Sequence, residues 1–159
     1  MNYFVTFRTY GTWLHGDERG SVDRFHNQVG EPLLEINPAL NIYRRRNMGS
    51  EPALLDEACR ACVNATLHEV AAHRKWTILA LNVLNNHVHA VVSTPDNVSP
   101  EKVMNDFKSW ATRRLREQKL VPPGVPIWAD HGSTRYLNDT ELVHAACHYV
   151  THGQNEPAA

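Results

Sequence analysis

The sequence has no apolar run long enough to span a bilayer, and its first residues, Met1 to Thr6, lack the charged-then-apolar pattern of a signal peptide. It has only three cysteines in 159 residues, and this odd count does not indicate a disulfide framework. Its formal net charge of -1 at pH 7 does not mark a nucleic-acid binder. We therefore expect a cytoplasmic protein without a membrane segment, with one core built from its 42% hydrophobic residues.

The residue pattern predicts a single domain, residues 1–159, that is interrupted near its start. Aromatic and β-branched residues favour a strand over residues 3–10. From about 11 to 52 the residues are polar and rich in turn formers. A structureless loop of this length is uncommon in a compact domain, so we interpret it as a functional, loop-rich insertion. We expect a short flexible tail at about 155–159.

The middle of the chain alternates helix and strand patterns. Apolar residues at steps of three and four predict a helix over about 54–72. Runs rich in β-branched residues predict two strands, at 76–84 and 87–93. Ser99, followed by a proline, is a suitable N-cap for a second helix that extends to about 119.

The last part of the sequence completes the predicted order. Short extended pieces are expected at 127–128 and 133–137. A last helix begins near 140, capped by Asn138 or Asp139, and ends at a glycine, residue 153. This order predicts an α+β fold, a ferredoxin-like antiparallel sheet with helices on one face, plus a C-terminal helix.

Two histidines separated by one valine, His87-Val88-His89, lie within a predicted central strand. Side chains two residues apart on a strand share a face, so both imidazoles point away from the two packing helices while Val88 points into the core. Two neutral imidazoles side by side supply half of a divalent-metal site. The alternative is a pair of hydrogen-bonded histidines on a half-exposed strand.

The last helix is the candidate source of the remaining ligands. It carries four polar side chains near its end, His148, Tyr149, His152 and Gln154. The residues expected on its core side are Leu142, Val143, Ala146 and Val150. This arrangement leaves Tyr149 near the boundary between buried and exposed positions, where the alternative to a reactive role is an amphipathic anchor. A zinc site at Cys59 and Cys62 is disfavoured, because no second pair follows them.

Several segments together resemble the single-tyrosine HUH transposases, which include the insertion-sequence transposases of the 200/605 type and their REP-associated relatives. The segments that carry the resemblance are the run from Phe4 to Leu14, Asn86-His87-Val88-His89, Lys108-Ser109-Trp110, the run from Trp128 to Tyr136, and the run from Tyr149 to Gln154. They follow one another in order along nearly the whole chain.

The resemblance implies an enzyme that cuts and rejoins single-stranded DNA through a 5′-phosphotyrosine intermediate. His87 and His89 match the metal-binding pair of this family, and Tyr149 matches its nucleophile. A phenol is a weak nucleophile, so attack requires its deprotonation and a metal, Mg²⁺ or Mn²⁺, at the cleaved phosphate. The resemblance further implies a homodimer that acts on hairpin-forming DNA, with an active site formed either within one subunit or by the tyrosine helix of one subunit and the histidine pair of the other. The alternative is a non-catalytic or domesticated DNA-hairpin-binding protein on the same fold.

The third metal ligand departs from the family pattern. In much of the family it is a glutamine or asparagine four residues after the tyrosine, where it shares the tyrosine's face. Here that position is Gly153, and Gln154 lies five residues after Tyr149, roughly 140° away on an ideal helix. We favour Gln154, brought round by unwinding at Gly153, with His152 as the alternative.

The basic residues are concentrated although the total charge is nearly zero. They form one run in the insertion and one group on the second helix, and such patches favour nucleic acid as the partner. An ordinary solvated helix face is the alternative for the second group. The candidate DNA-binding residues are Arg8, Arg44, Arg45, Arg46, Lys108, Arg113 and Arg114.

Overall fold

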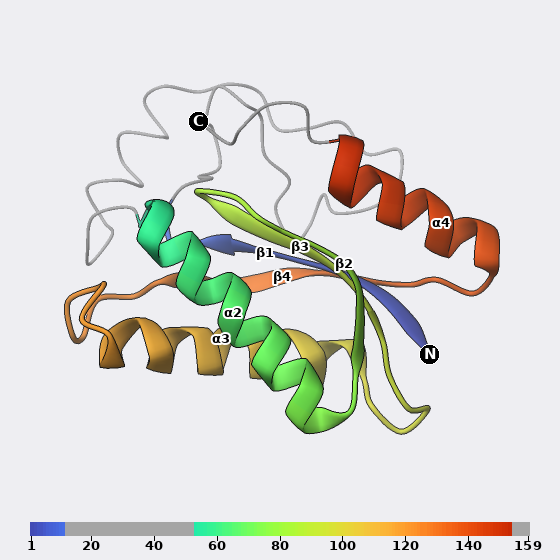
Figure 1. Ribbon diagram of the computed structural model, residues 1–159, viewed down its shortest axis with the longest axis horizontal. Helices are drawn as coiled ribbons and strands as arrows, with labels where there is room; N and C mark the ends of the chain where they lie inside the picture. Colours follow the sequence, from blue (N-terminus) through green and yellow to red (C-terminus); the bar gives the residue numbers. More distant parts are fainter. Residues whose placement is uncertain (12–52, 154–159) are drawn as a thin grey trace.

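The computed structural model describes residues 1–11 and 53–153 and contains a four-stranded antiparallel sheet (Figure 1). The strands are β1 (Asn2–Thr9), β2 (Thr77–Val83), β3 (His87–Ser93) and β4 (Trp128–Tyr136), and their order in the sheet is β2-β3-β1-β4. This order confirms the predicted ferredoxin-like fold. The predicted tail lies outside the described residues, and so does the predicted insertion except for its first residue, Gly11.

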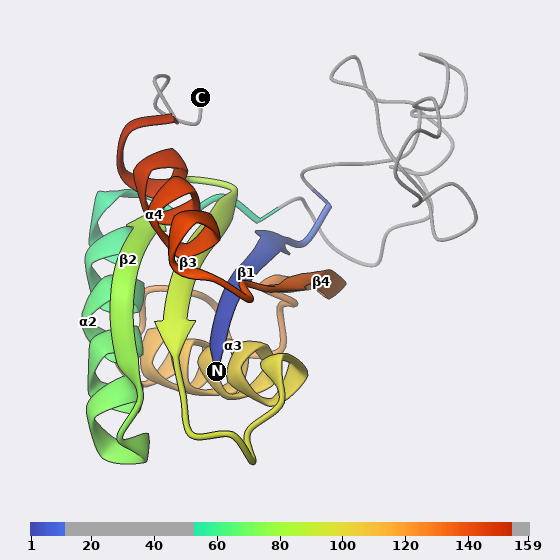
Figure 2. The same ribbon diagram turned by 90° about the vertical axis from the view of Figure 1, so that its right-hand side faces the viewer.

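Two helices, α2 (Glu57–Arg74) and α3 (Pro100–Glu117), cover one face of the sheet, as Figure 2 shows. Both begin at a side chain that accepts a backbone N–H, since Asp56 accepts from Cys59 and Ser99 accepts from Lys102. The main core lies between these helices and the sheet. Its fully buried members include Val5, Phe7, Val63, Leu67, Val88, Ala90, Val103 and Phe107.

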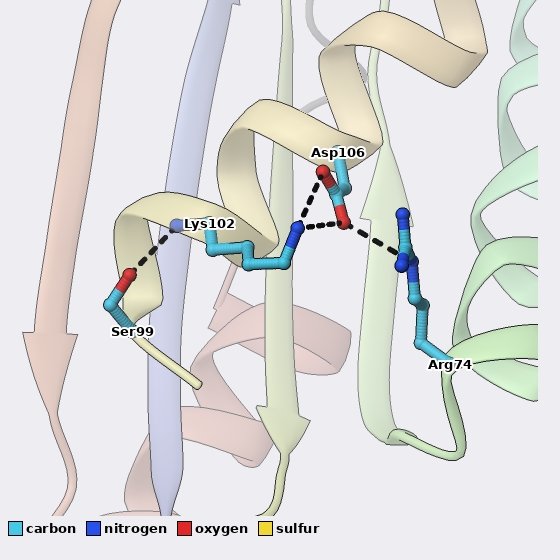
Figure 3. A network of polar contacts seen from close by, with 4 residues as sticks. All are labelled: Arg74, Ser99, Lys102 and Asp106. Carbon is cyan, nitrogen blue, oxygen red and sulfur yellow. Dashed lines mark hydrogen bonds and ion pairs between the residues drawn. The ribbon is translucent and has the colours of Figure 1, made fainter. Parts of the chain in front are cut away.

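The outer sides of α2 and α3 are joined by ion pairs. In Figure 3 the carboxylate of Asp106 on α3 lies 3.3 Å from the Arg74 guanidinium of α2 and 3.2 Å from the Lys102 ammonium. Cys59 and Cys62 are buried on the inner side of α2, and burial raises the pKa of the Cys59 thiol to about 11.

The opposite face of the sheet is partly covered by α4 (Thr140–His148) and the π-helical turn η1 (Tyr149–Gly153) (Figure 2). Asp139, one of the two predicted caps, accepts the Leu142 N–H at 2.8 Å. A second apolar cluster anchors this segment, formed by Ala80, Val91, Leu137, Ala146 and Val150, with Phe4, Val143 and Cys147 at its edge. The predicted core side of the helix is therefore correct for Val143, Ala146 and Val150 and wrong for Leu142, which is 38% exposed.

Strand β4 is one continuous strand where the sequence predicted two short pieces. It pairs with β1 from Tyr3↔Tyr136 to Thr9↔Trp128, with an irregularity between Phe7 and Thr9. A Cβ at Gly132 would lie 2.5 Å from the Thr6 carbonyl oxygen, so glycine is needed for this close approach. No helix among the described residues is long and apolar enough to cross a membrane.

Candidate active site

The histidine pair lies on the face of the sheet that α4 and η1 cover. His87 and His89 are both buried, and their ring centroids are 4.6 Å apart. On β1, Thr6 is the register partner of His89, and its Oγ1 lies 2.8 Å from the His89 Nδ1. The His87 Nδ1 lies 2.6 Å from the Oδ1 of the buried Asn86.

These hydrogen bonds orient both rings. The Asn86 Oδ1 can only accept, so the His87 Nδ1 carries the proton and the ring's lone pair lies on Nε2. Burial, together with the nearby His87 and Arg8, lowers the pKa of His89 to about 4. Both effects favour the neutral imidazole that metal binding requires.

Tyr149 and His89 lie side by side in the same chain. The ring centroid of Tyr149 is 5.6 Å from that of His89 and 6.0 Å from that of Phe4. The next residue, Val150, is fully buried, and its carbonyl accepts a 3.2 Å hydrogen bond from the Asn82 side chain of β2. Packing therefore holds the backbone at Tyr149 against the sheet, while the tyrosine side chain remains 45% exposed.

The two candidate third ligands differ in what the structure says of them. His152 is exposed, stacks on His148 with ring centroids 4.8 Å apart, and its Nδ1 lies 2.7 Å from the Thr151 Oγ1. Gln154 lies outside the described residues. Within the described ranges, no group of three His, Cys, Asp or Glu side chains is arranged to hold a metal ion.

A groove of about 510 Å³ opens beside Tyr149, between α4 and the strands β1 and β4. Its lining combines apolar side chains with two arginines and no carboxylate. The lining residues are Phe4, Thr6, Arg8, His89, Ser133, Arg135, Leu137, Leu142, Ala145, Ala146 and Tyr149. Arg8, a predicted DNA-binding residue, therefore lies in the same groove as the candidate nucleophile.

The other described candidates for DNA binding lie on α3, across the sheet from the histidines. The Lys108 ammonium donates to the Ala129 carbonyl at 3.0 Å, and burial lowers the pKa of Lys108. The Arg113 guanidinium lies 4.4 Å from the ring centroid of Trp110, and Arg114 pairs with a glutamate of α2 at 3.1 Å. Arg44, Arg45 and Arg46 lie outside the described residues.

Sequence reasoning missed two residues of the groove, Ser133 and Arg135. They lie opposite Thr6 and Phe4 in the pairing of β4 with β1, and both are exposed. Their alternation in Ser133-Thr134-Arg135 is a strand pattern that places both side chains on one face. The alternation shows that Ser133 and Arg135 share a face of the strand. It does not show which face of the sheet that is until the pairing of β4 with β1 is known.

The fold is similar to two solved structures. A REP-associated tyrosine transposase bound to a REP hairpin superposes with a TM-score of 0.52 at 12% sequence identity, covering 96% of this chain and 66% of that one. A protein from Deinococcus radiodurans R1 described as a transposase gives a TM-score of 0.55 at 14% identity, covering 100% of this chain and 92% of that one. At these identities the likeness shows a common fold.

Sequence comparison identifies the family. Among curated proteins, none matches the chain. The family model for IS200-like transposases matches residues 47–126, about half of the chain, and this range includes both histidines but ends before Tyr149. The chain belongs to the IS200-like transposase family.

Proposed function

We propose that this protein cuts and rejoins single-stranded DNA, with Tyr149 as the nucleophile and His87 and His89 as metal ligands. The observation that carries the proposal is the 5.6 Å separation between the ring centroids of Tyr149 and His89 within one chain. The other tyrosine near this end of the sheet, Tyr136, instead contacts Tyr3 edge-on at 5.2 Å, and Tyr3 belongs to the core beneath α2 and α3. Of these two tyrosines, Tyr149 is the one that contacts the histidine pair.

The reaction exchanges one phosphodiester for another. The Tyr149 oxygen forms a bond to phosphorus as the bond from phosphorus to the 3′ oxygen breaks. The phenolic proton passes to solvent or a nearby base, and the departing 3′ oxygen gains a proton. Because the phosphotyrosine conserves the bond energy, attack by a 3′ hydroxyl reverses the step and no nucleotide cofactor is needed.

The donor chemistry fits a divalent metal. Two neutral imidazoles, one with its lone pair placed on Nε2 by Asn86, are suitable nitrogen ligands, and Mg²⁺ or Mn²⁺ is the expected ion. When bound, such an ion polarises the cleaved phosphate and offsets the charge on its oxygens. His87 and His89 would hold it, and their burial excludes competing water from one side.

The π turn at Tyr149 supports Gln154 as the third ligand. In a π turn the hydrogen-bonded residues are five positions apart, one more than in an α-helix. Tyr149 is the first residue of η1, and Gln154 follows it by five. We therefore propose that Gln154 completes the site with its amide oxygen, with His152, stacked on His148, as the alternative.

The proposed partner is single-stranded DNA that forms hairpins, since the REP-associated relative was solved bound to a hairpin. A homodimer remains part of the proposal. The proximity of Tyr149 and His89 within one chain supports an active site formed in cis, in which dimerisation does not supply the nucleophile.

Covalent trapping tests the proposal. Labelled hairpin DNA with a single-stranded flank is incubated with the protein and Mg²⁺ or Mn²⁺, and we expect an adduct that survives denaturant. Tyr149→Phe should abolish the adduct while DNA binding is retained, and Tyr136→Phe is the matched control that should leave it unchanged. An adduct that persists in Tyr149→Phe would overturn the assignment. Binding without any adduct in the parent protein would favour the non-catalytic hairpin-binding alternative.

A further inference from the structure

We propose that the groove beside Tyr149 seats one nucleotide adjoining the cleaved phosphodiester, with Arg135 holding a phosphate and Leu142 contacting the base. This inference rests on the proposed function, because it takes Tyr149 as the reacting residue. It assigns a substrate-positioning role to Arg135 and Leu142, neither of which the sequence placed at the site.

Arg135 is placed to meet an anion at the edge of the site. It lies opposite Phe4 in the pairing of β4 with β1, and the Phe4 ring is 5.6 Å from His89 and 6.0 Å from Tyr149 between centroids. Arg135 is exposed, and no carboxylate among the described residues pairs with it. A guanidinium is suited to a phosphate because its donors can bind two oxygens at once.

Leu142 is the residue that we place in contact with the base of the bound nucleotide. The sequence predicted it on the core side of the last helix, but the structure leaves it 38% exposed, which corrects that prediction. It lines the groove together with Leu137 and Ala145, so part of the groove wall is apolar. A nucleotide has the matching chemistry, a flat base with an apolar face joined to an anionic phosphate.

The dimensions favour an unpaired nucleotide. The groove volume of about 510 Å³ is bounded on one side by α4 and on the other by the sheet. Arg8 lies four residues along β1 from Phe4, the partner of Arg135, which corresponds to about 13 Å along the strand. The two arginines therefore start from well-separated backbone positions along the strands. A base can enter between them only when it is unstacked from its neighbours.

The experiment compares DNA affinity by fluorescence anisotropy, without metal, and adduct formation with Mn²⁺, for four proteins. Arg135→Gln should weaken single-stranded DNA binding roughly 10-fold and slow the adduct at subsaturating DNA, while Arg135→Lys should recover most of the affinity. Lys102→Gln removes an exposed cation of α3, the helix on the opposite face of the sheet (Figure 2), and should leave both measurements within about 2-fold. Unchanged affinity in Arg135→Gln would overturn the role of Arg135.

The base contact is tested with DNA in which one nucleotide at a time, on either side of the cleaved bond, is replaced by an abasic site. In the parent protein one position should weaken binding roughly 10-fold, and in Leu142→Ala that penalty should shrink. An equal loss of affinity in both proteins would refute the proposed contact between Leu142 and a base. The anisotropy measurements need no chemistry, so absence of an adduct in the parent protein would refute the proposed function and leave the test of the groove intact.

Discussion

The two faces of the sheet are built from alternate residues of the same strands, yet they differ in almost every physical respect. On β3, Val88 and Ala90 point to α2 and α3 and are fully buried in an apolar core, while His87 and His89 point to α4. Among the described residues, the core beneath α2 and α3 contains no histidine and no charged side chain, whereas the other face buries two imidazoles beside a groove. The first face therefore supplies stability, and the second holds reactive groups in place.

The largest expected effect is a loss of stability on the face of the sheet that α2 and α3 cover. Phe107 is fully buried and packs against Trp76 with ring centroids 6.0 Å apart, so Phe107→Ala should lower the free energy of unfolding by about 3–5 kcal/mol. The melting temperature should fall by roughly 10 °C, measured by circular dichroism. His89→Ala should instead abolish the metal-dependent adduct with a smaller loss of stability. Equal stability losses in both variants would contradict the claim that the face beneath α2 and α3 supplies most of the stability.

A second test uses the pH dependence of stability. The pKa of His89 is lowered to about 4 in the folded protein, against about 6.5 for an unfolded histidine. As the pH falls from 6.5 to 4, His89 becomes protonated in the unfolded chain but stays neutral in the folded protein. The free energy of unfolding therefore decreases over this pH range. The loss from this one group is at most on the order of 3 kcal/mol.

Urea denaturation in EDTA at pH 7 and pH 4.5 measures this loss. His89→Asn removes the titrating group, so its stability should change less between the two pH values than that of the parent protein. The difference between the two proteins isolates His89 from the other histidines. An equal change in both would show that the buried environment of His89 does not disfavour its charged form.

Helix caps provide a third, smaller test. Asp139 caps α4 and Ser99 caps α3, with N–H to oxygen distances of 2.8 and 3.2 Å. Asp139→Ala and Ser99→Ala should each cost about 1 kcal/mol in urea denaturation. The adduct rate should fall in Asp139→Ala alone, because α4 leads directly into Tyr149. A similar fall in Ser99→Ala would mean that global stability, and not the position of α4, limits the reaction.

Periodicity predicted the parts of this structure that depend on local pattern. The bounds of β3, the caps at Ser99 and Asp139, and the common face of His87 and His89 all follow from spacing and residue type. The continuity of β4 does not, because most of its side chains are exposed and carry no apolar alternation. Its formation depends on pairing with β1, which brings Gly132 against the Thr6 backbone.

The missed features of the site have a related cause. The π-helical turn that begins at Tyr149 is held against the sheet by the burial of Val150 and by a hydrogen bond from the Asn82 side chain, 68 residues away in the sequence. The charge pattern of α3 similarly shows that a helix face is basic, but it does not show which partners its arginines have. The stacking of Arg113 on Trp110 and the ion pair of Arg114 with Glu69 required the tertiary structure.

The smallest expected effect concerns that basic surface of α3. Arg113 stacks on Trp110 across the sheet from the histidine pair, so Arg113→Gln should change the unfolding free energy by less than about 1 kcal/mol. We predict that it contacts DNA backbone, and its loss should then reduce the slope of log affinity against log salt by about 1, equally for different DNA sequences. The adduct rate at saturating DNA should stay unchanged, in contrast to Tyr149→Phe. An unchanged salt slope would confine DNA binding to the face that carries Tyr149 and Arg135.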